Sequence, residues 1–187
     1  MKVYIIRHGE SEANFKGVWT GWSDVPLTEL GKKQAQAIAP LLKTDFDKIF
    51  SSDLIRAKET AENAIEKCHY ETTPLLREIN VGTLANKTLP VLSPEQKANI
   101  NENGYEMFAG ESKTEFINRV TDFKKKLENL NCENVAVFTH NGWLRTFLDE
   151  VLGLNVPWKK ITCKNCTVAI FEYENNEWKL YSWINSN

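Results

Sequence analysis

The chain has 187 residues, of which 42% are hydrophobic, and this is enough apolar side chain to bury one substantial core. Its formal net charge at pH 7 is only -2, so no strong charge indicates a nucleic acid or an anionic membrane as partner. No apolar run reaches the length of a bilayer span, and the first residues lack the features of a signal peptide. We therefore expect a cytoplasmic protein that forms a single domain over residues 1–187, with a homodimer left open.

The first predicted element is a buried strand. Residues 3–6 are β-branched and aromatic and too few for a helix, and Arg7, His8 and Gly9 follow them directly. Ligands of open α/β sheets bind at the carboxyl ends of the strands. An arginine and a histidine placed there have the chemistry to hold and attack a phosphoryl group.

Further elements alternate along the first half of the chain. A loop leads to a helix that Thr28 can cap and that kinks or ends near Pro40. A strand over residues 46–52 comes next, followed by a helix that opens with polar capping residues at Asp53 and carries Arg56 in its first turn. We expect this position to bring a second guanidinium to the same crevice at the carboxyl ends of the strands.

The middle of the chain breaks this alternation. A short strand is predicted over residues 72–76, and then residues 80–110 are polar and carry turn signals such as Ser93-Pro94. We interpret residues 80–110 as an insertion that forms a lid over the crevice. A helix follows the capping box that begins at Ser112. Four aromatic residues near the expected mouth of the crevice could pack against a ring of the ligand or have only a structural role: Trp19, Trp22, Tyr105 and Phe108.

The last third repeats the order of strand and histidine. A buried strand over residues 135–139 leads to His140 and then to a helix over about residues 143–152. Two late strands, 167–173 and 178–183, are joined by a hairpin turn, which predicts antiparallel pairing. The elements together predict an α/β fold with three layers: a mostly parallel sheet with helices on both faces, an antiparallel edge strand and the inserted lid region.

Four blocks of sequence with polar residues stand at predicted strand ends or helix starts. They are Arg7-His8-Gly9-Glu10-Ser11 with Asn14, the run from Ser51 to Ala61 that contains Arg56, Leu76-Arg77-Glu78-Ile79-Asn80-Val81-Gly82, and Thr139-His140-Asn141-Gly142. In order and spacing these blocks resemble the histidine phosphatase superfamily, also called the phosphoglycerate-mutase-like family, over nearly the whole chain. One polar residue at a strand end is commonly a structural group, whereas four such blocks in order form a specific signal.

The resemblance implies a reaction mechanism. His8 would be the nucleophile of a metal-independent phosphomonoester hydrolase that acts through a phosphohistidine intermediate on a small phosphorylated metabolite. Neutral imidazole suits this role, because its ordinary pKa lies near 6.5. Arg7 and Arg56 would clamp the phosphoryl oxygens, and His140 would stabilise the transition state.

The resemblance also assigns an acid and a set of binding residues. Taken alone, Glu78 is more commonly a solvated glutamate paired with Arg77, but its place in the four-block pattern matches the general acid of the family. The implied partner is a small-molecule phosphate ester, and the family chemistry requires no cofactor and no metal. The residues that would bind the substrate are Arg7, Asn14, Thr20, Gly21, Arg56 and Asn141.

Two activities and one non-catalytic role stay open. A phosphoglycerate mutase must hold a carboxylate as well as phosphoryl groups, and therefore needs additional cations. Residues 79–111 contain no arginine, and their only lysines are Lys87 and Lys97, which favours hydrolysis over isomerisation. The alternatives are a phosphoglycerate mutase and a phosphate-binding module without catalysis. The chain also departs from the phosphatase pattern at residues 83–87, so the substrate is left open.

The cysteines do not predict a metal site. Cys163 and Cys166 have the spacing of half a zinc site, but Cys68 and Cys132 stand alone and do not supply the other half. We expect reduced thiols and no metal.

Overall fold

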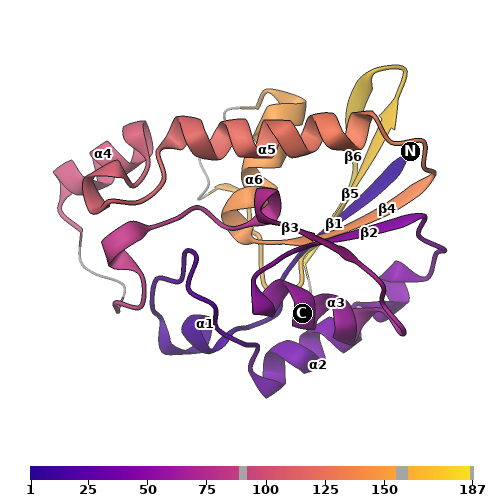
Figure 1. Cartoon of the computed structure of the whole chain (residues 1–187), viewed down its shortest axis with the longest axis horizontal. Coiled ribbons are helices and arrows are strands. Elements are labelled where there is room, and N and C mark those ends of the chain that lie inside the picture. Colours follow the sequence, from indigo (N-terminus) through magenta and orange to yellow (C-terminus); the bar gives the residue numbers. More distant parts are fainter. Residues whose placement is uncertain (89–91, 155–159, 186–187) are drawn as a thin grey trace.

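A single sheet forms the centre of the molecule (Figure 1). The computed structural model describes residues 1–88, 92–154 and 160–185. Within these ranges six strands pair in the order β3-β2-β4-β1-β5-β6. They are β1 (Lys2–Arg7), β2 (Lys48–Ser52), β3 (Glu71–Thr73), β4 (Asn134–Thr139), β5 (Val168–Glu174) and β6 (Glu177–Ile184).

Most neighbouring strands are parallel, as the sequence predicted. β4 pairs in parallel with β1 and with β2, and β2 pairs in parallel with β3. β5 runs antiparallel to β1, and β6 antiparallel to β5. The turn between the last two strands contains Asn175 and Asn176, whose φ angles are 52° and 64°. Such positive φ angles match a tight hairpin turn to the twist of its strands. The predicted fold class is confirmed.

Helices cover both faces of this sheet. They are α1 (Glu12–Lys16), α2 (Glu29–Ala37), α3 (Ile55–Ala64), α4 (Pro94–Asn103), α5 (Lys113–Glu128) and α6 (Asn141–Leu152), with 3₁₀ turns at Ala39–Leu42, Pro74–Leu76, Gly82–Leu84 and Glu106–Phe108. In Figure 1, α5 and α6 lie above the sheet and α2 and α3 below it. None of the helices in the described ranges is both long and apolar enough to cross a bilayer.

Two apolar cores fill the space between the layers. One packs α5 and α6 against Val135 and Val137 of β4, and the other packs α2 and α3 against Ala136 and Phe138 of the same strand. This division follows from the geometry of a strand, in which successive side chains point to opposite faces. The sheet is thereby packed on both faces, and the carboxyl ends of β1 and β4 lie side by side.

The start of α3 differs from the prediction. The helix begins at Ile55, with Leu54 as N-cap and no side-chain capping bond from its own segment. Instead, the side chain of Asp24 accepts a hydrogen bond from the Ile55 N–H at 2.6 Å. The predicted cap at Asp53 is therefore wrong, because Asp53 pairs with Arg77.

Two further segments differ in secondary structure. The strand predicted over residues 72–76 ends at Thr73, and Pro74 then begins a 3₁₀ turn. The second difference is α4, which the sequence did not predict. Ser93 and Pro94 were interpreted as a turn, but Ser93 caps α4 and Pro94 occupies its first turn, where no backbone N–H is needed.

The segment over residues 80–110 packs against the loop that follows α1. The Trp19 N–H donates to the carbonyl of Lys87 at 3.0 Å, and the Asn86 N–H donates to the carbonyl of Trp19 at 2.7 Å. Residues 89–91 of the predicted lid lie outside the described residues. The lid role and the single-domain organisation stay predictions.

Candidate active site

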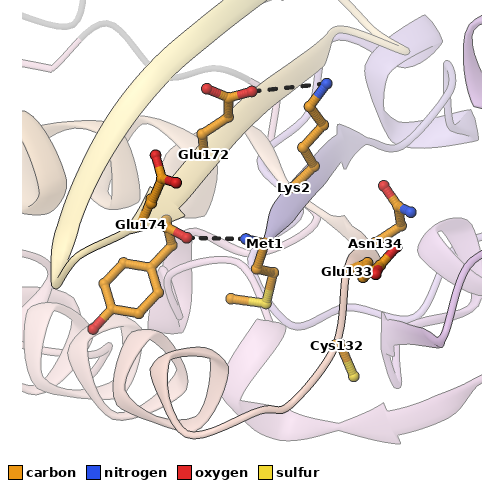
Figure 2. A pocket seen from close by; sticks show the side chains of 8 residues that line it. Met1, Lys2, Cys132, Glu133, Asn134, Glu172 and Glu174 are labelled. Atoms are coloured by element: carbon orange, nitrogen blue, oxygen red, sulfur yellow. Dashed lines mark hydrogen bonds and ion pairs between the residues drawn. The ribbon is translucent and has the colours of Figure 1, made fainter.

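A hollow of about 430 Å³ lies at the amino end of β1 and has no histidine in its lining (Figure 2). Both of its cationic groups already have partners. Lys2 lies 3.7 Å from Glu172, and the amino group of Met1 donates to the carbonyl of Tyr173 at 3.0 Å; both contacts are dashed in Figure 2. Despite its size, this hollow offers no converging set of catalytic groups.

A second hollow, of about 270 Å³, lies at the carboxyl ends of β1 and β4, where the sequence predicted a crevice. His140 is the one predicted site residue outside its lining, and it packs against His8 with ring centroids 5.2 Å apart. The chain therefore gathers distant segments around one small volume. The predicted residues that line the hollow are Arg7, His8, Asn14, Thr20, Gly21, Arg56, Glu78 and Asn141.

His8 is held in one tautomer at the end of β1. Its Nδ1 lies 2.7 Å from the carbonyl oxygen of Gly9, and because a carbonyl can only accept, Nδ1 carries the proton. Nε2 therefore keeps its lone pair. The carbonyl of His8 accepts hydrogen bonds from the Cys166 N–H at 3.2 Å and from the Asn165 side chain at 3.1 Å. The loop before β5 thus fixes the residue.

At Gly9 there is no room for a side chain, because α2 passes close beside it. A Cβ at Gly9 would lie 2.5 Å from the carbonyl oxygen of Gly31 in α2, which is too close for any side chain. The Gly9 N–H donates to the Thr60 hydroxyl at 3.0 Å, and Thr60 donates to the carbonyl of Arg56 at 2.7 Å. These contacts join the end of β1 to α2 and α3.

His140 is fully buried, and neither of its ring nitrogens has a hydrogen-bond partner among the described residues. Its ring meets that of His8 edge to face. Burial, and then the positive charge of Arg56, lowers the pKa of both histidines well below the usual value. Both imidazoles are therefore neutral at pH 7, the state in which an imidazole nitrogen keeps the lone pair of a nucleophile.

Two guanidinium groups lie in the hollow. Arg7 donates from Nη1 to the carbonyl of Cys163 at 2.5 Å. Arg56 donates to the carbonyls of Gly21 and Ser23 at 2.8 and 2.9 Å, so it also holds the loop after α1. The Nε atom of each arginine has no partner within the described ranges. Burial lowers the pKa of Arg56 to about 10, which leaves the group charged at pH 7.

The carboxylate of Glu78 is oriented by backbone groups. Oε1 accepts from the Ile79 N–H at 2.9 Å, and Oε2 accepts from the Gly142 N–H in the first turn of α6, also at 2.9 Å. Arg77, the alternative partner, instead makes a bidentate pair with Asp53 at 2.8 and 2.6 Å. Glu78 therefore belongs to the hollow and not to a salt bridge with its neighbour.

Asn14 and Asn141 also line the hollow, but their side-chain oxygens differ in whether they already accept hydrogen bonds. The Oδ1 atom of Asn14 already accepts hydrogen bonds from the cap of α1, whereas Oδ1 of Asn141 is buried without a partner in the described part of the chain. Gly21 has φ +48°, and a Cβ there would lie 2.8 Å from the side chain of Val81. The loop that carries Thr20 therefore passes close to the segment after Glu78.

The four loop aromatics divide into two groups. Trp19 and Tyr105 line the hollow, with ring centroids 5.6 Å apart. Trp22 donates from Nε1 to the carbonyl of Glu78 at 2.7 Å, and Phe108 packs on the apolar core. The sequence offered only their aromatic character, which does not separate a ligand-facing ring from a structural one.

Cys163 and Cys166 are buried, and burial raises the pKa of both thiols. Thiols with a raised pKa are poor nucleophiles and poor metal ligands. Within the described ranges no group of three or more histidine, cysteine or acidic side chains could hold a metal ion. The loop that carries both cysteines holds Arg7 and His8 through its backbone and through the side chain of Asn165.

Known proteins are similar to this chain in sequence and in fold. Residues 3–186 match the model of the histidine phosphatase superfamily (branch 1). A probable phosphoglycerate mutase, GpmB of Yersinia pestis (strain Pestoides F), is 31% identical over 194 residues, which cover 98% of this chain and 90% of that protein. A phosphoglycerate mutase structure from Thermus thermophilus is 29% identical, with a TM-score of 0.76 and coverage of 100% of both chains. A mutant phosphoserine phosphatase from Entamoeba histolytica, crystallised with phosphoserine, is 26% identical, with a TM-score of 0.82 and coverage of 97% of this chain and 95% of that one. The chain belongs to the histidine phosphatase superfamily.

Proposed function

We propose that this protein hydrolyses phosphomonoesters through a phosphohistidine formed on His8, without a metal. The observation that carries the proposal is the hydrogen bond from Nδ1 of His8 to the carbonyl of Gly9, because it leaves the lone pair on Nε2. Burial lowers the pKa of this histidine, so the lone pair is available at neutral pH.

The reaction consists of two displacements at phosphorus. In the first, Nε2 of His8 attacks phosphorus, the bond between phosphorus and the alcohol oxygen breaks, and Glu78 gives a proton to that oxygen. In the second, the carboxylate of Glu78 takes a proton from water, the water oxygen attacks phosphorus, and the phosphorus–nitrogen bond breaks. Inorganic phosphate leaves, and His8 and Glu78 return to their starting states.

The transition state places negative charge on the phosphoryl oxygens. The Nε–H groups of Arg7 and Arg56, which have no partner among the described residues, are proposed to donate to these oxygens. A phosphate dianion beside His140 would raise the pKa of that imidazole and make it a further donor. The backbone N–H groups in the first turn of α6, which starts at Asn141, add the positive end of a helix.

Hydrolysis is proposed ahead of isomerisation because of the charges around the hollow. Among the described lining residues the cationic side chains are Arg7 and Arg56, and both are assigned to the phosphoryl group. A phosphoglycerate also carries a carboxylate, whose burial without a further cation is unfavourable. Lys87 and Lys97 are exposed and do not line the hollow. Phosphoglycerate mutase activity is the second candidate, because two of the similar proteins carry that name.

A steady-state assay separates these candidates. The purified protein would be given p-nitrophenyl phosphate with and without EDTA, and separately a phosphoglycerate. We expect release of nitrophenol that EDTA does not reduce, and no isomerisation faster than phosphate release. Rapid isomerisation would support the mutase, and binding without turnover across a panel of phosphorylated metabolites would support a non-catalytic phosphate-binding module.

A further inference from the structure

Arg119 in α5 donates hydrogen bonds to the backbone of the segment that carries Glu78. Its Nη1 lies 3.1 Å from the carbonyl oxygen of Leu75 and 2.7 Å from that of Arg77. Its Nη2 lies 3.2 Å from the carbonyl oxygen of Glu78 itself. One guanidinium therefore holds three carbonyl groups of the backbone that leads into the hollow.

Glu111 holds Arg119 in place and extends the contact past Glu78. Its carboxylate accepts from Nε and Nη2 of Arg119 at 2.9 and 2.8 Å, and also from the Asn80 N–H at 3.1 Å. Only 12% of the Arg119 side chain and 9% of the Glu111 side chain are exposed. All five N–H groups of the guanidinium can thus be matched to acceptors, which the three-donor amine of a lysine cannot reproduce.

A buried ion pair is weak evidence for stability by itself, because its desolvation offsets much of the attraction. Here the pair binds the backbone on both sides of Glu78. The carbonyl of Glu78 accepts a second hydrogen bond, from Trp22, so this peptide group is held from two directions. We propose that Arg119 and Glu111 are positioning residues that fix the backbone from which the Glu78 carboxyl group reaches the hollow. The proposal rests on the proposed function in one respect, namely that Glu78 is the general acid.

A misplaced general acid slows some substrates more than others. An alkyl phosphate releases a basic alkoxide that needs the proton, whereas p-nitrophenyl phosphate releases a stable phenolate that hardly needs it. The ratio kcat/KM reports the steps up to transfer of the phosphoryl group to His8. Because a displacement of about 1 Å can cost about 10²-fold in rate, loss of positioning should appear as a selective loss with the alkyl substrate.

The test compares kcat/KM for glycerol phosphate and p-nitrophenyl phosphate in four variants: Arg119→Lys, Glu111→Gln, Glu78→Gln and the control Lys126→Met. Lys126 also lies on α5 and makes an ion pair, at 2.6 Å, but with exposed Glu71 away from the hollow. For Arg119→Lys and Glu111→Gln we expect the alkyl substrate to lose about tenfold to 10²-fold more than the aryl substrate. Lys126→Met should change both substrates equally and by less than about twofold.

Three outcomes separate this proposal from the proposed function. Selective loss in Glu78→Gln and in either positioning variant supports both, and Glu111→Gln gives the answer if Arg119→Lys does not fold. Equal loss with the two substrates in both positioning variants, beside selective loss in Glu78→Gln, overturns the positioning role and leaves Glu78 as the acid. If Glu78→Gln itself shows no selectivity, the acid assignment and the positioning role both fail, while the phosphohistidine on His8 stands as a separate claim.

Discussion

At the scale of single residues, Glu78 is the acidic side chain among the described lining residues of the hollow, and two backbone amides hold its carboxylate there. Replacing it with glutamine removes the transferable proton but keeps the size of the side chain. We expect Glu78→Gln to lower kcat for an alkyl phosphate by about 10²- to 10⁴-fold, the usual contribution of a general acid. Glu106→Gln is the matched control, because Glu106 is exposed and does not line the hollow. Unchanged turnover in Glu78→Gln would remove this residue from the mechanism.

The two buried histidines also predict how stability depends on pH. Burial, followed by the charge of Arg56, lowers the pKa of His8 and His140. Below about pH 6.5 the unfolded chain therefore binds more protons than the folded one, so stability is complete above that pH and falls as the pH drops. The slope is up to about 1.4 kcal/mol per pH unit for each histidine.

Urea unfolding between about pH 7 and pH 5.5 measures this slope. Within that range the carboxylates with lowered pKa values, such as Asp53, stay ionised in both states and contribute little. The variant His140→Asn should show a slope smaller by up to about 1.4 kcal/mol per pH unit. Equal slopes for the variant and the parent protein would contradict the buried, neutral state of His140.

The location of these residues was predictable, but their orientation was not. His8 and His140 follow buried strands, and the ends of neighbouring parallel strands meet at one edge of a sheet. The tautomer of His8 depends on the bond from its ring to the carbonyl of Gly9. The backbone of His8 is held by the side chain of Asn165, which is distant in sequence. The backbone carbonyls that accept from Arg119 are also distant, since they lie more than forty residues away. Hydrogen bonds between distant segments leave no periodic pattern in one sequence.

At the scale of elements, the capping box of α5 offers a direct test. The Ser112 hydroxyl accepts from the Glu115 N–H at 3.0 Å, and the Glu115 carboxylate accepts from the Ser112 N–H at 2.9 Å. Because α5 contributes buried residues to the core, Ser112→Ala should lower the free energy of unfolding by about 0.5–2 kcal/mol in urea. Ser93→Ala removes the same kind of cap from α4, which has no buried residue, and should cost less. Equal costs for both variants would contradict this link between capping and core packing.

The elements that were predicted well are those in which the capping residues and the pattern of apolar residues indicate the same structure. The cap at Ser112 and the apolar stripe of α5 indicate the same helix. The signals were ambiguous for α4, because Ser93-Pro94 suits both a turn and a helix start. At α3 the capping acceptor is Asp24, from a different segment, and no local pattern could identify it.

At the scale of the whole molecule, Phe147 joins α6 to the antiparallel edge of the sheet. It stacks on Trp143 with centroids 5.3 Å apart and meets Phe171 and Trp178 edge to face at 5.1 and 5.2 Å. Phe147→Ala should therefore lower the free energy of unfolding by about 3–5 kcal/mol. The control is Phe15→Ala, which removes a ring that is 74% exposed and should change stability by less than about 0.5 kcal/mol. Comparable midpoints in a denaturant titration of the two variants would refute this account of the core.

The overall class of the fold was predictable because strand and helix signals alternate along most of the chain. The strand order was not, since it is set by which strands pair across long separations. β1 lies between β4 and β5, both far from it in sequence. This order brings the loops around His8 and His140 to one place, and the site is therefore a product of the topology.

The most direct test of the central claim is to trap the phosphorylated protein. The protein would be mixed with a labelled phosphomonoester, quenched in base within one turnover, digested, and analysed by mass spectrometry. We predict phosphate on the peptide that contains His8, stable in base and lost in acid, and no such peptide from His8→Asn. Full turnover by His8→Asn, or phosphate bound to a different residue, would contradict the account.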